Sequence, residues 1–324
     1  MATTNKIKWG ILGLGKIAHK FAQDLAQVQD AELHAVASRY QEKAEVFSRK
    51  FGALKAYDSY EKLAKDPEID AIYIATPHSL HKENTLLCLR HKKAVLCEKP
   101  FAMNEQEVSE MIQTAQEHDV LLMEGLWTRF LPHFKYVIEV VHSEKFGKVK
   151  TLHADFGFYR KFDTQDRLFN KAVGGGSVLD IGIYPIFVAL ATLGIPKEIA
   201  ATAQFFENGA DSACVMTFHY DEATAYLKSS LVEDLPIEVV FQFEKATLKI
   251  HNQFHAPTTV TILTEGTSET LDFTSANLGY QFEIEHFNKL LHENKKESDL
   301  MPFAFSKNLI RTLDSVRNRI GLQY

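Results

Sequence analysis

Cysteine is scarce in this sequence, and the cysteines that are present are scattered. Cys88, Cys97 and Cys214 form no C-x-x-C pair among the 324 residues. A disulfide framework and a cysteine-rich zinc site are therefore not expected, and a reducing, cytoplasmic location fits best. The N-terminal residues Met1–Lys8 are polar and lead directly into a strand pattern, so we expect no secretory signal.

The sequence also lacks an excess of basic residues and an uninterrupted membrane-spanning run. Its 36 Lys and Arg residues are outnumbered by 42 Asp and Glu residues, which gives a formal charge of −6. Nucleic-acid binding normally requires a basic surface, so we do not expect that class of partner. The most apolar stretch, Val178–Ile195, is long enough to span a bilayer but contains Asp180, Gly182 and Pro185. We interpret it as a buried helix and expect no membrane association.

What the sequence does contain is an ordinary globular composition, with 45% hydrophobic and 24% charged residues. In the first third of the chain, short apolar runs alternate with amphipathic segments, which predicts a doubly wound parallel sheet of the Rossmann type. After Trp127, strands follow one another with short turns, which predicts an α+β domain on a large, mostly antiparallel open sheet. We expect a dinucleotide-binding domain over residues 1–126 and a substrate-binding and oligomerisation domain over residues 127–324. For the final predicted helix, Phe303–Ile320, packing against the first domain is an alternative to packing within the second.

A glycine motif of the form G-x-G-x-x-A lies between the first predicted strand and the first predicted helix. Gly13 suits a tight turn, Gly15 lets the backbone approach a pyrophosphate, and Ala18 lets the helix pack closely on the strand. Lys16 and Ile17 open the helix, whose N-terminal N–H groups favour phosphate. The motif predicts dinucleotide binding, although glycines at a sharp turn also occur without a ligand.

The end of the second predicted strand carries the residues expected to select the cofactor. NAD-selective sites usually place an acidic side chain here, whereas this chain has Ser38, Arg39 and Tyr40. A hydroxyl and a guanidinium suit a 2′-phosphate, which favours NADP over NAD. Arg39 has two other interpretations, which are stacking on adenine and a simple solvated position at the strand end.

Two histidines follow the fourth strand of the predicted sheet, at the edge where ligands collect in such sheets. The segment contains Thr76, His78 and His81. The histidine spacing raises the possibility of a metal, but no third ligand lies nearby in the sequence, so we expect none. We expect His78 to contact the nicotinamide side of a cofactor site and His81 to begin a helix.

The next strand runs into Glu98, Lys99 and Pro100. A lysine at the carboxyl end of a buried strand is poorly explained by packing, because lysine is rarely buried without a partner. A cation there can bind a substrate hydroxyl and lower the pKa of a neighbouring acid. The alternative is a Glu98–Lys99 pair that only caps the strand.

Together these motifs resemble the Gfo/Idh/MocA oxidoreductase family, and the resemblance extends over essentially the whole chain. It is similar to the branch that contains dimeric dihydrodiol dehydrogenase and NADP-dependent D-xylose 1-dehydrogenase. The resemblance implies hydride transfer at a carbinol carbon, with Lys99 and Tyr184 matching the catalytic pair. The segments that narrow the resemblance to this branch are Met123–Pro132, Arg167–Phe169 and Gly174–Pro185.

Inositol-dehydrogenase-like members of the family carry histidine where this chain has Tyr184. A phenol with a pKa of about 10 needs a nearby cation to transfer protons near neutrality, and Lys99 is the candidate. We therefore expect the Lys99 ammonium and the Tyr184 phenol to meet across a crevice. Asp180 lies one helical turn before Tyr184, and two roles stay open for it: capping the helix or orienting Tyr184 and the substrate.

The resemblance also implies a pocket beside the nicotinamide, lined by Trp127 and Arg129. Phe156 and Phe158 alternate along a predicted strand and suit either the core or an aromatic pocket for a cyclic substrate. Arg167 is a candidate for holding a phosphate or a substrate oxygen, with an ordinary surface arginine as the alternative.

We expect an NADP-dependent oxidoreductase that acts on a small molecule, namely a sugar or a related cyclic polyol or dihydrodiol. A second possibility keeps the family but replaces this substrate with a keto-sugar, an imine or an enone. A third is a cofactor-binding regulator without catalysis, against which the retention of Lys99 and Tyr184 argues. The open antiparallel sheet favours a homodimer formed through that sheet.

Overall fold

The computed structural model describes residues 6–324, which form two compact units. The first unit contains the chain up to Phe130 together with Asn277–Lys307. The second contains Leu131–Ala276 together with Asn308–Tyr324. The first unit therefore includes a late segment in addition to the stretch that its sequence pattern assigns to it.

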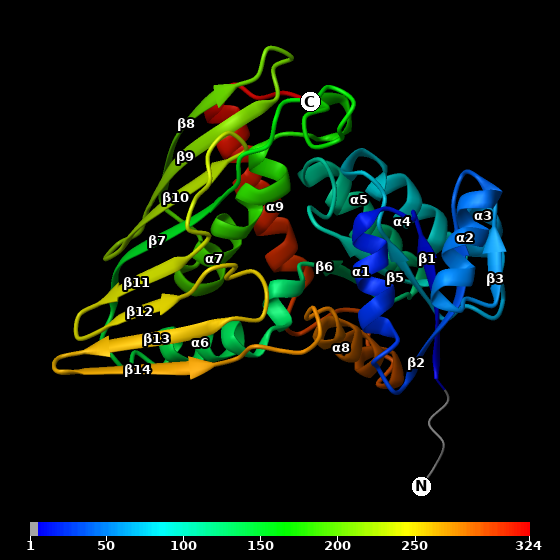
Figure 1. Ribbon diagram of the computed structural model, residues 1–324, viewed down its shortest axis with the longest axis horizontal. Coiled ribbons are helices and arrows are strands. Elements are labelled where there is room, and N and C mark those ends of the chain that lie inside the picture. Colours follow the sequence, from blue (N-terminus) through cyan, green and yellow to red (C-terminus); the bar gives the residue numbers. More distant parts are fainter. Residues whose placement is uncertain (1–5) are drawn as a thin grey trace, which may run out of the picture. The chain divides into compact units, whose positions relative to one another are not determined.

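The first unit is a doubly wound parallel sheet with the strand order β3-β2-β1-β4-β5-β6. All residues of β4 and β5 are buried, which explains why these strands are short apolar runs without alternation. The predicted Rossmann-type architecture is confirmed (Figure 1). Its strands are β1 (Ile7–Leu12), β2 (Ala31–Ala37), β3 (Lys55–Tyr57), β4 (Ala71–Ile74), β5 (Ala94–Glu98) and β6 (Leu122–Gly125). Its helices are α1 (Lys16–Leu25), α2 (Gln41–Phe51), α3 (Tyr60–Lys65), α4 (His81–Arg90), α5 (Glu105–His118) and α8 (Gln281–His292).

Two buried polar contacts attach the late segment to the first unit. The Asp24 carboxylate, at the end of α1, accepts backbone N–H bonds from Leu278, Gly279 and Tyr280 at 3.2, 2.8 and 2.8 Å. The indole N–H of Trp9 in β1 donates to Asn288 Oδ1 in α8 at 3.1 Å. Because each contact links groups that would be costly to bury without a partner, the start and the middle of α8 are held against α1 and β1.

The second unit is built on an eight-stranded sheet with the order β14-β13-β12-β11-β7-β10-β9-β8. The β7–β10 pair is parallel and the other pairs are antiparallel, so the predicted mostly antiparallel sheet is confirmed. Its strands are β7 (Val149–Gly157), β8 (Glu198–Phe205), β9 (Asp211–His219), β10 (Thr224–Ser230), β11 (Val239–Phe243), β12 (Thr247–Ile250), β13 (Thr259–Thr264) and β14 (Thr267–Asp272). Its helices are α6 (Pro132–His142), α7 (Ile183–Leu193) and α9 (Phe303–Ile320), of which α9 begins in the segment assigned to the first unit.

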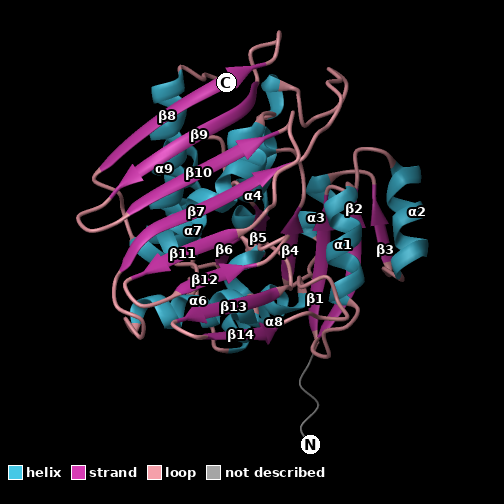
Figure 2. Ribbon diagram, turned by 60° about the vertical axis from the view of Figure 1, so that its left-hand side comes forward, coloured by secondary structure: helices cyan, strands magenta, loops and turns pink. Residues whose placement is uncertain are grey.

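The two faces of this sheet differ. Cys214, Met216 and Phe218 of β9 are buried, whereas the alternate residues Val215 and His219 are exposed. Figure 2 shows the strands in front of the helices, and among the described residues no helix covers the front face. The alternation thus marks one face that packs on α7 and one that faces outward.

The apolar stretch around residues 171–193 lies inside the second unit. Among the described residues, Lys171–Leu193 is the one helical run apolar and long enough to cross a membrane, and 89% of its most apolar window is buried. Such burial is typical of a core helix, in agreement with the interpretation from sequence. Within it, a π-helical turn at Val178–Gly182 precedes α7.

Two strands were not predicted from sequence. β3 has three residues and is half-buried throughout, so it presents no apolar run. β14 forms the edge of the large sheet, and five of its six residues are exposed. An edge strand of this kind lacks the periodicity on which sequence-based strand prediction depends.

Candidate active site

Gly13 closes the turn after β1 in a conformation that requires glycine. Its φ angle is +90°, and an added Cβ would lie 2.9 Å from Thr76 Cγ2 and 3.0 Å from the Ala75 backbone. A side chain at this position is excluded both by the backbone conformation and by the neighbouring loop after β4. The turn therefore brings the loops after β1 and β4 into direct contact, at the carboxyl edge of the sheet.

Gly15 immediately precedes α1 and has different surroundings. None of the described residues places an atom within 4 Å of the position that a Cβ would take. Lys16 and Ile17 begin α1, which has no acidic residue in its first turn, and Ala18 is fully buried. The N–H groups of this turn thus meet the requirements of a phosphate cradle: accessible backbone, a helix N-terminus and no competing carboxylate.

The predicted cofactor-selecting residues lie at the end of β2. Ser38 is buried, and its hydroxyl accepts the Tyr40 N–H at 3.3 Å. Arg39 is exposed, and Tyr40 is 69% exposed. The side chains of Arg39 and Tyr40 are therefore accessible to a ligand beside β2, while Ser38 braces the backbone that carries them.

Thr76, His78 and His81 are all buried in the loop after β4 and the start of α4. The predicted helix start at His81 is confirmed. Its Nδ1 lies 2.8 Å from the Pro100 carbonyl oxygen and its Nε2 lies 2.9 Å from the Thr76 carbonyl oxygen. The imidazole therefore ties the loop after β4 to the loop after β5. The contacts of His78 and His81 with a cofactor stay predictions.

Lys99 follows directly on a buried acidic residue. Glu98 ends β5, is 7% exposed, and accepts a short hydrogen bond from the Tyr73 hydroxyl in β4. The Lys99 N–H donates to Glu98 Oε2 at 3.2 Å, and the Lys99 side chain is half-buried. Glu98 is thus engaged by groups of β4 and by its own loop, which holds the backbone from which Lys99 extends.

Glu124 is a second buried carboxyl group beside Lys99, and sequence reasoning did not single it out as a site residue. It lies in β6, is 2% exposed, and its Oε1 accepts the Phe101 N–H at 3.1 Å. Burial raises its pKa to about 7, against the opposing effects of a Ser306 hydrogen bond, the Phe101 N–H and the Lys99 charge. The signal for Glu124 was weak, because a glutamate in a short strand is not distinctive without its neighbours.

The segment after β6 places an aromatic pair and a cation in the first unit. Trp127 is buried and stacks on Tyr280 with ring centroids 4.4 Å apart and an interplanar angle of 7°. Burial lowers the pKa of Arg129, with the nearby Asp299 acting in the opposite direction. Tyr280, which comes from the late segment, is a neighbour of Trp127 that sequence spacing could not identify.

Tyr184, in the first turn of α7, lies in an aromatic cluster of the second unit. Its ring centroid is 5.3 Å from those of Phe156 and His255, and Phe156 and His255 are 4.5 Å apart. Phe158 lies just after the end of β7, with its ring 6.4 Å from that of Phe156. His255 was missed from sequence, because the loop between β12 and β13 carries no motif. The cluster surrounds the phenol with flat rings that suit a cyclic ligand.

Asp180 and Arg167 form an ion pair in the second unit, with Arg167 Nη1 3.1 Å from Asp180 Oδ1. Of the two roles left open for Asp180, capping the helix is not observed. Asp180 lies inside the π-helical turn, and the N-terminal groups of this segment are satisfied by the buried Asp211, which accepts the Ser177 hydroxyl and the Val178 N–H at 2.7 Å each. The helix starts earlier than Pro185 suggested, because the π-helical turn precedes α7.

The predicted site residues thus fall into two groups. Those of the glycine turn, β2, the β4 and β5 loops and the segment after β6 belong to the first unit. Tyr184, Asp180, Phe156, Phe158 and Arg167 belong to the second. The first group offers a phosphate cradle and a lysine that follows the buried Glu98 and acts electrostatically on the buried Glu124. The second group offers a phenol in an aromatic cluster and a charged pair.

Comparison with known families also divides the chain into two parts, one in each unit. Residues 7–126 match the model of an oxidoreductase family with an NAD-binding Rossmann fold, and residues 134–262 match the GFO/IDH/MocA C-terminal domain. Together these two matches extend over more than half of the chain.

Relatives align along nearly the full length of the chain. Trans-1,2-dihydrobenzene-1,2-diol dehydrogenase of Danio rerio is 36% identical over 332 residues, with 98% of each chain covered. The NADP(+)-dependent scyllo-inositol 2-dehydrogenase IolU of Bacillus subtilis is 33% identical over 325 residues, again with 98% of each covered. A crystal structure of aldose-aldose oxidoreductase from Caulobacter crescentus shares the fold, with a TM-score of 0.89, 21% identity and 97% of each chain covered.

Proposed function

Because the chain belongs to the Gfo/Idh/MocA oxidoreductase family, we propose that it transfers hydride between NADP and a carbinol carbon. The proposed substrate is a sugar or a related cyclic polyol or dihydrodiol. The observation that carries the proposal is the placement of Lys99 at the carboxyl end of β5, next to the buried carboxyl groups of Glu98 and Glu124. Diol and inositol dehydrogenase relatives support the CH–OH chemistry.

The cofactor site we propose is the glycine turn with the end of β2. The backbone at Gly13 and Gly15 and the N-terminus of α1 would hold the pyrophosphate, because N–H groups there carry no competing acid. The exposed guanidinium of Arg39 would pair with the 2′-phosphate, which favours NADP over NAD. When bound, the nicotinamide supplies the hydride acceptor or donor.

The protein's part in the reaction is proton transfer and charge stabilisation. In the oxidative direction, Tyr184 in its phenolate form would take the hydroxyl proton of the substrate. In the reductive direction, Tyr184 returns that proton to the carbonyl oxygen. Lys99 is proposed to stabilise the phenolate form of Tyr184 and the developing charge on the substrate oxygen. Asp180 and Arg167 are proposed to orient substrate hydroxyl groups.

A cyclic substrate fits the residues around Tyr184. Phe156 and His255 present flat rings 4.5 Å apart beside the phenol, and such surfaces pack against the faces of sugar or cyclohexane rings. The charged pair Asp180–Arg167 adds hydrogen-bonding groups in the same unit. We therefore favour cyclic polyols and dihydrodiols over a keto-sugar, an imine or an enone.

The test is an assay of NADP+ reduction with a panel of polyols and diols, and of NADPH oxidation with the corresponding carbonyl compounds. We expect turnover with at least one cyclic substrate, and a loss of about 10²-fold or more in kcat for Lys99→Met at unchanged fold. NADPH affinity, measured by quenching of protein fluorescence, serves as the second readout. Tight NADPH binding without turnover on any compound, unchanged in Lys99→Met, would instead indicate a regulator that has lost catalysis.

We also propose that the chain forms a homodimer through the outward face of the large sheet. On adjacent strands β9 and β10, Val215 is 50% exposed and Tyr226 is 45% exposed. Large apolar side chains on an uncovered sheet face support an interface there. Light scattering should give a dimer mass for the wild type and a monomer mass for Val215→Glu/Tyr226→Lys. Lys197→Glu, at an exposed site before β8, is the control and should leave the dimer intact.

A further inference from the structure

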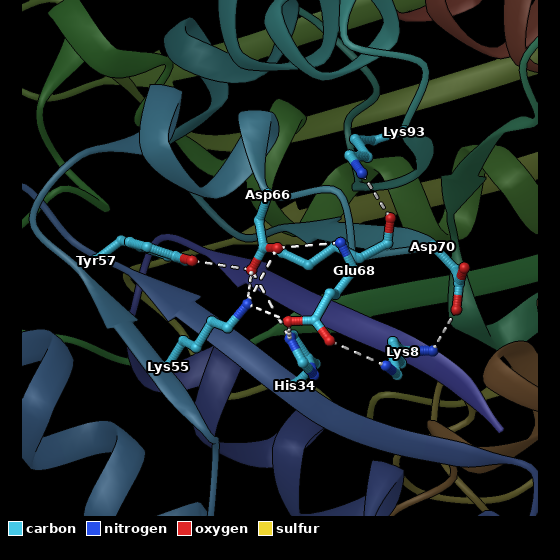
Figure 3. Close-up of polar contacts among 9 residues, drawn as sticks. Lys8, His34, Lys55, Tyr57, Asp66, Glu68, Asp70 and Lys93 are labelled. Carbon is cyan, nitrogen blue, oxygen red and sulfur yellow. Dashed lines mark hydrogen bonds and ion pairs between the residues drawn. The ribbon is translucent and has the colours of Figure 1, made fainter.

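A compact polar cluster in the first unit has no part in the proposed hydride transfer. It consists of His34 in β2, Asp66 at the end of α3 and Glu68 in the connection to β4. One ligand atom from each of these residues lies within 4.8 Å of the other two. Figure 3 shows the imidazole of His34 pointing toward both carboxylates. The three members belong to separate elements, so no sequence motif indicates this arrangement, whereas the His78/His81 pair was the candidate for metal ligands in the sequence.

The geometry is close to that of three ligands on one ion. His34 Nε2 lies 3.6 Å from Glu68 Oε2 and 3.8 Å from Asp66 Oδ2. Ligand atoms of a tetrahedral zinc ion, at about 2.0–2.2 Å from the metal, lie about 3.4 Å from one another. The two nitrogen–oxygen separations are therefore within about 0.4 Å of that value, and the three ligand atoms all lie within 4.8 Å of one another.

The imidazole of His34 is the second and independent observation. The residue is 2% exposed, and neither of its ring nitrogens has a hydrogen-bond partner among the described residues. A buried polar group without a partner is costly, so such groups in folded proteins usually have a ligand, an ion or a water. An imidazole nitrogen directed at two carboxylates is the arrangement that a divalent transition metal satisfies in one step.

A cation already lies at the open side of the cluster. Lys55 Nζ is 2.5 Å from Glu68 Oε2 and 3.0 Å from Asp66 Oδ2. The hydrogen bond to Glu68, and to a smaller extent the one to Asp66, raises the pKa of Lys55 well above its ordinary value. The lysine side chain is 35% exposed, so it can swing into solvent and leave both carboxylate oxygens to a metal ion. The Tyr57 hydroxyl, which donates to Asp66 Oδ2 at 2.9 Å, would then orient a ligand as an outer partner.

From this geometry we propose that His34, Asp66 and Glu68 form a binding site for a divalent transition-metal ion such as Zn²⁺. One nitrogen and two carboxylate oxygens favour zinc and its neighbours over Mg²⁺ or Ca²⁺, which prefer oxygen ligands alone. Water would complete the coordination on the side that Lys55 leaves. The ion would join β2 to the connection between α3 and β4, and so stabilise the dinucleotide-binding unit.

The site is separate from the chemistry of the first unit. Asp66 and Glu68 precede the amino end of β4, whereas the glycine turn and the loop of His78 follow the carboxyl ends of β1 and β4. Metal binding is therefore expected to stabilise the fold without being required for hydride transfer. Its test uses the full chain and does not depend on enzyme activity.

The experiment is titration of chelator-stripped protein with Zn²⁺ by calorimetry, together with thermal unfolding in the presence and absence of the ion. We expect saturable binding of one ion per chain and a higher Tm with zinc. His34→Gln should weaken binding by about tenfold or more, because the nitrogen ligand is lost. Co²⁺ should give visible absorption bands in the wild type that are missing from His34→Gln.

Two further variants keep the result interpretable. Lys55→Met removes the competing ammonium and should strengthen zinc binding, which a purely structural role of the cluster would not produce. His292→Gln is the matched control. His292, at the end of α8, has a single carboxylate beside it, with its Nε2 3.1 Å from Asp30 Oδ2, so this variant should bind zinc like the wild type. Absence of saturable binding up to millimolar zinc would overturn the proposal, as would equal affinities for the wild type, His34→Gln and Lys55→Met.

Discussion

His133 Nε2 lies 2.8 Å from the carbonyl oxygen of Phe254, a residue 121 positions later in the chain. His133 belongs to α6 and is fully buried, and Phe254 immediately precedes His255 in the loop between β12 and β13. The bond therefore fixes the loop that carries His255 to its contact with Tyr184. Because the carbonyl is an acceptor, the neutral imidazole must donate from Nε2. Burial, partly offset by the Phe254 carbonyl, lowers the pKa of His133 to about 4.

This relationship predicts that His133 makes the protein less stable in acid. Between about pH 6.5 and 4 the unfolded chain binds a proton at His133 that the folded protein excludes, so the free energy of unfolding falls as pH falls through that range. The free energy of unfolding should change by about 3 kcal/mol over this range. His133→Gln retains an N–H donor for the Phe254 carbonyl and should remove this dependence of stability on pH. Urea unfolding at several pH values measures the change, and His142→Gln, at an exposed histidine, is the control.

Glu124 predicts a pH dependence of the opposite sign in nearly the same range. Its folded pKa of about 7 exceeds the ordinary value of 4.5, so the folded protein binds a proton that the unfolded chain releases. Stability from this group is present below about pH 4.5 and is lost as pH rises to about 7. Glu124→Gln mimics the protonated acid and removes this loss. The effect of His133 then remains, so the stability of this variant should rise with pH. His133→Gln should show the reverse slope, and two parallel curves would contradict both assignments.

Arg39 is predicted to determine the preference for NADP. Arg39→Ala removes the cation proposed for the 2′-phosphate, so KM for NADPH should rise about tenfold or more while KM for NADH changes little. Steady-state kinetics with both cofactors gives the ratio directly. Arg49→Ala is the matched control, because Arg49 lies on the exposed side of α2 beside Glu45, at 3.8 Å. If the ratio of KM for NADPH to KM for NADH is unchanged in Arg39→Ala, Arg39 is a solvated residue at the strand end without a role in cofactor binding.

Tyr184→Phe is predicted to remove proton transfer and to retain packing. The ring contacts with Phe156 and His255 persist, so the fold and cofactor affinity should be unchanged. The value of kcat should fall by about 10²-fold or more, because the group that transfers the proton is lost. Tyr220→Phe is the control, since the buried Tyr220 hydroxyl has no hydrogen-bond partner among the described residues. Retention of wild-type kcat in Tyr184→Phe would remove the phenol from the mechanism.

Much of the fold was predictable because it depends on local patterns. The parallel strands β1, β4 and β5 are apolar runs of strand length, and Gly13 marks a turn that sterics allow only to glycine. The exposed strand β14 was missed, since its side chains carry no apolar alternation. The capping role considered for Asp180 fails for a different reason: the helical segment begins with a π-helical turn, which no residue type indicates.

The sequence alone determined the family resemblance, the cofactor turn and the candidate pair Lys99 and Tyr184, because each is carried by neighbouring residues in a short motif. Only the tertiary structure brought together Trp127 with Tyr280, His133 with Phe254, and His34 with Asp66 and Glu68. These contacts join residues from separate elements, and burial then decides their protonation and their partners. Which polar groups are buried together depends on how the whole chain packs, and no short motif carries a signal for that.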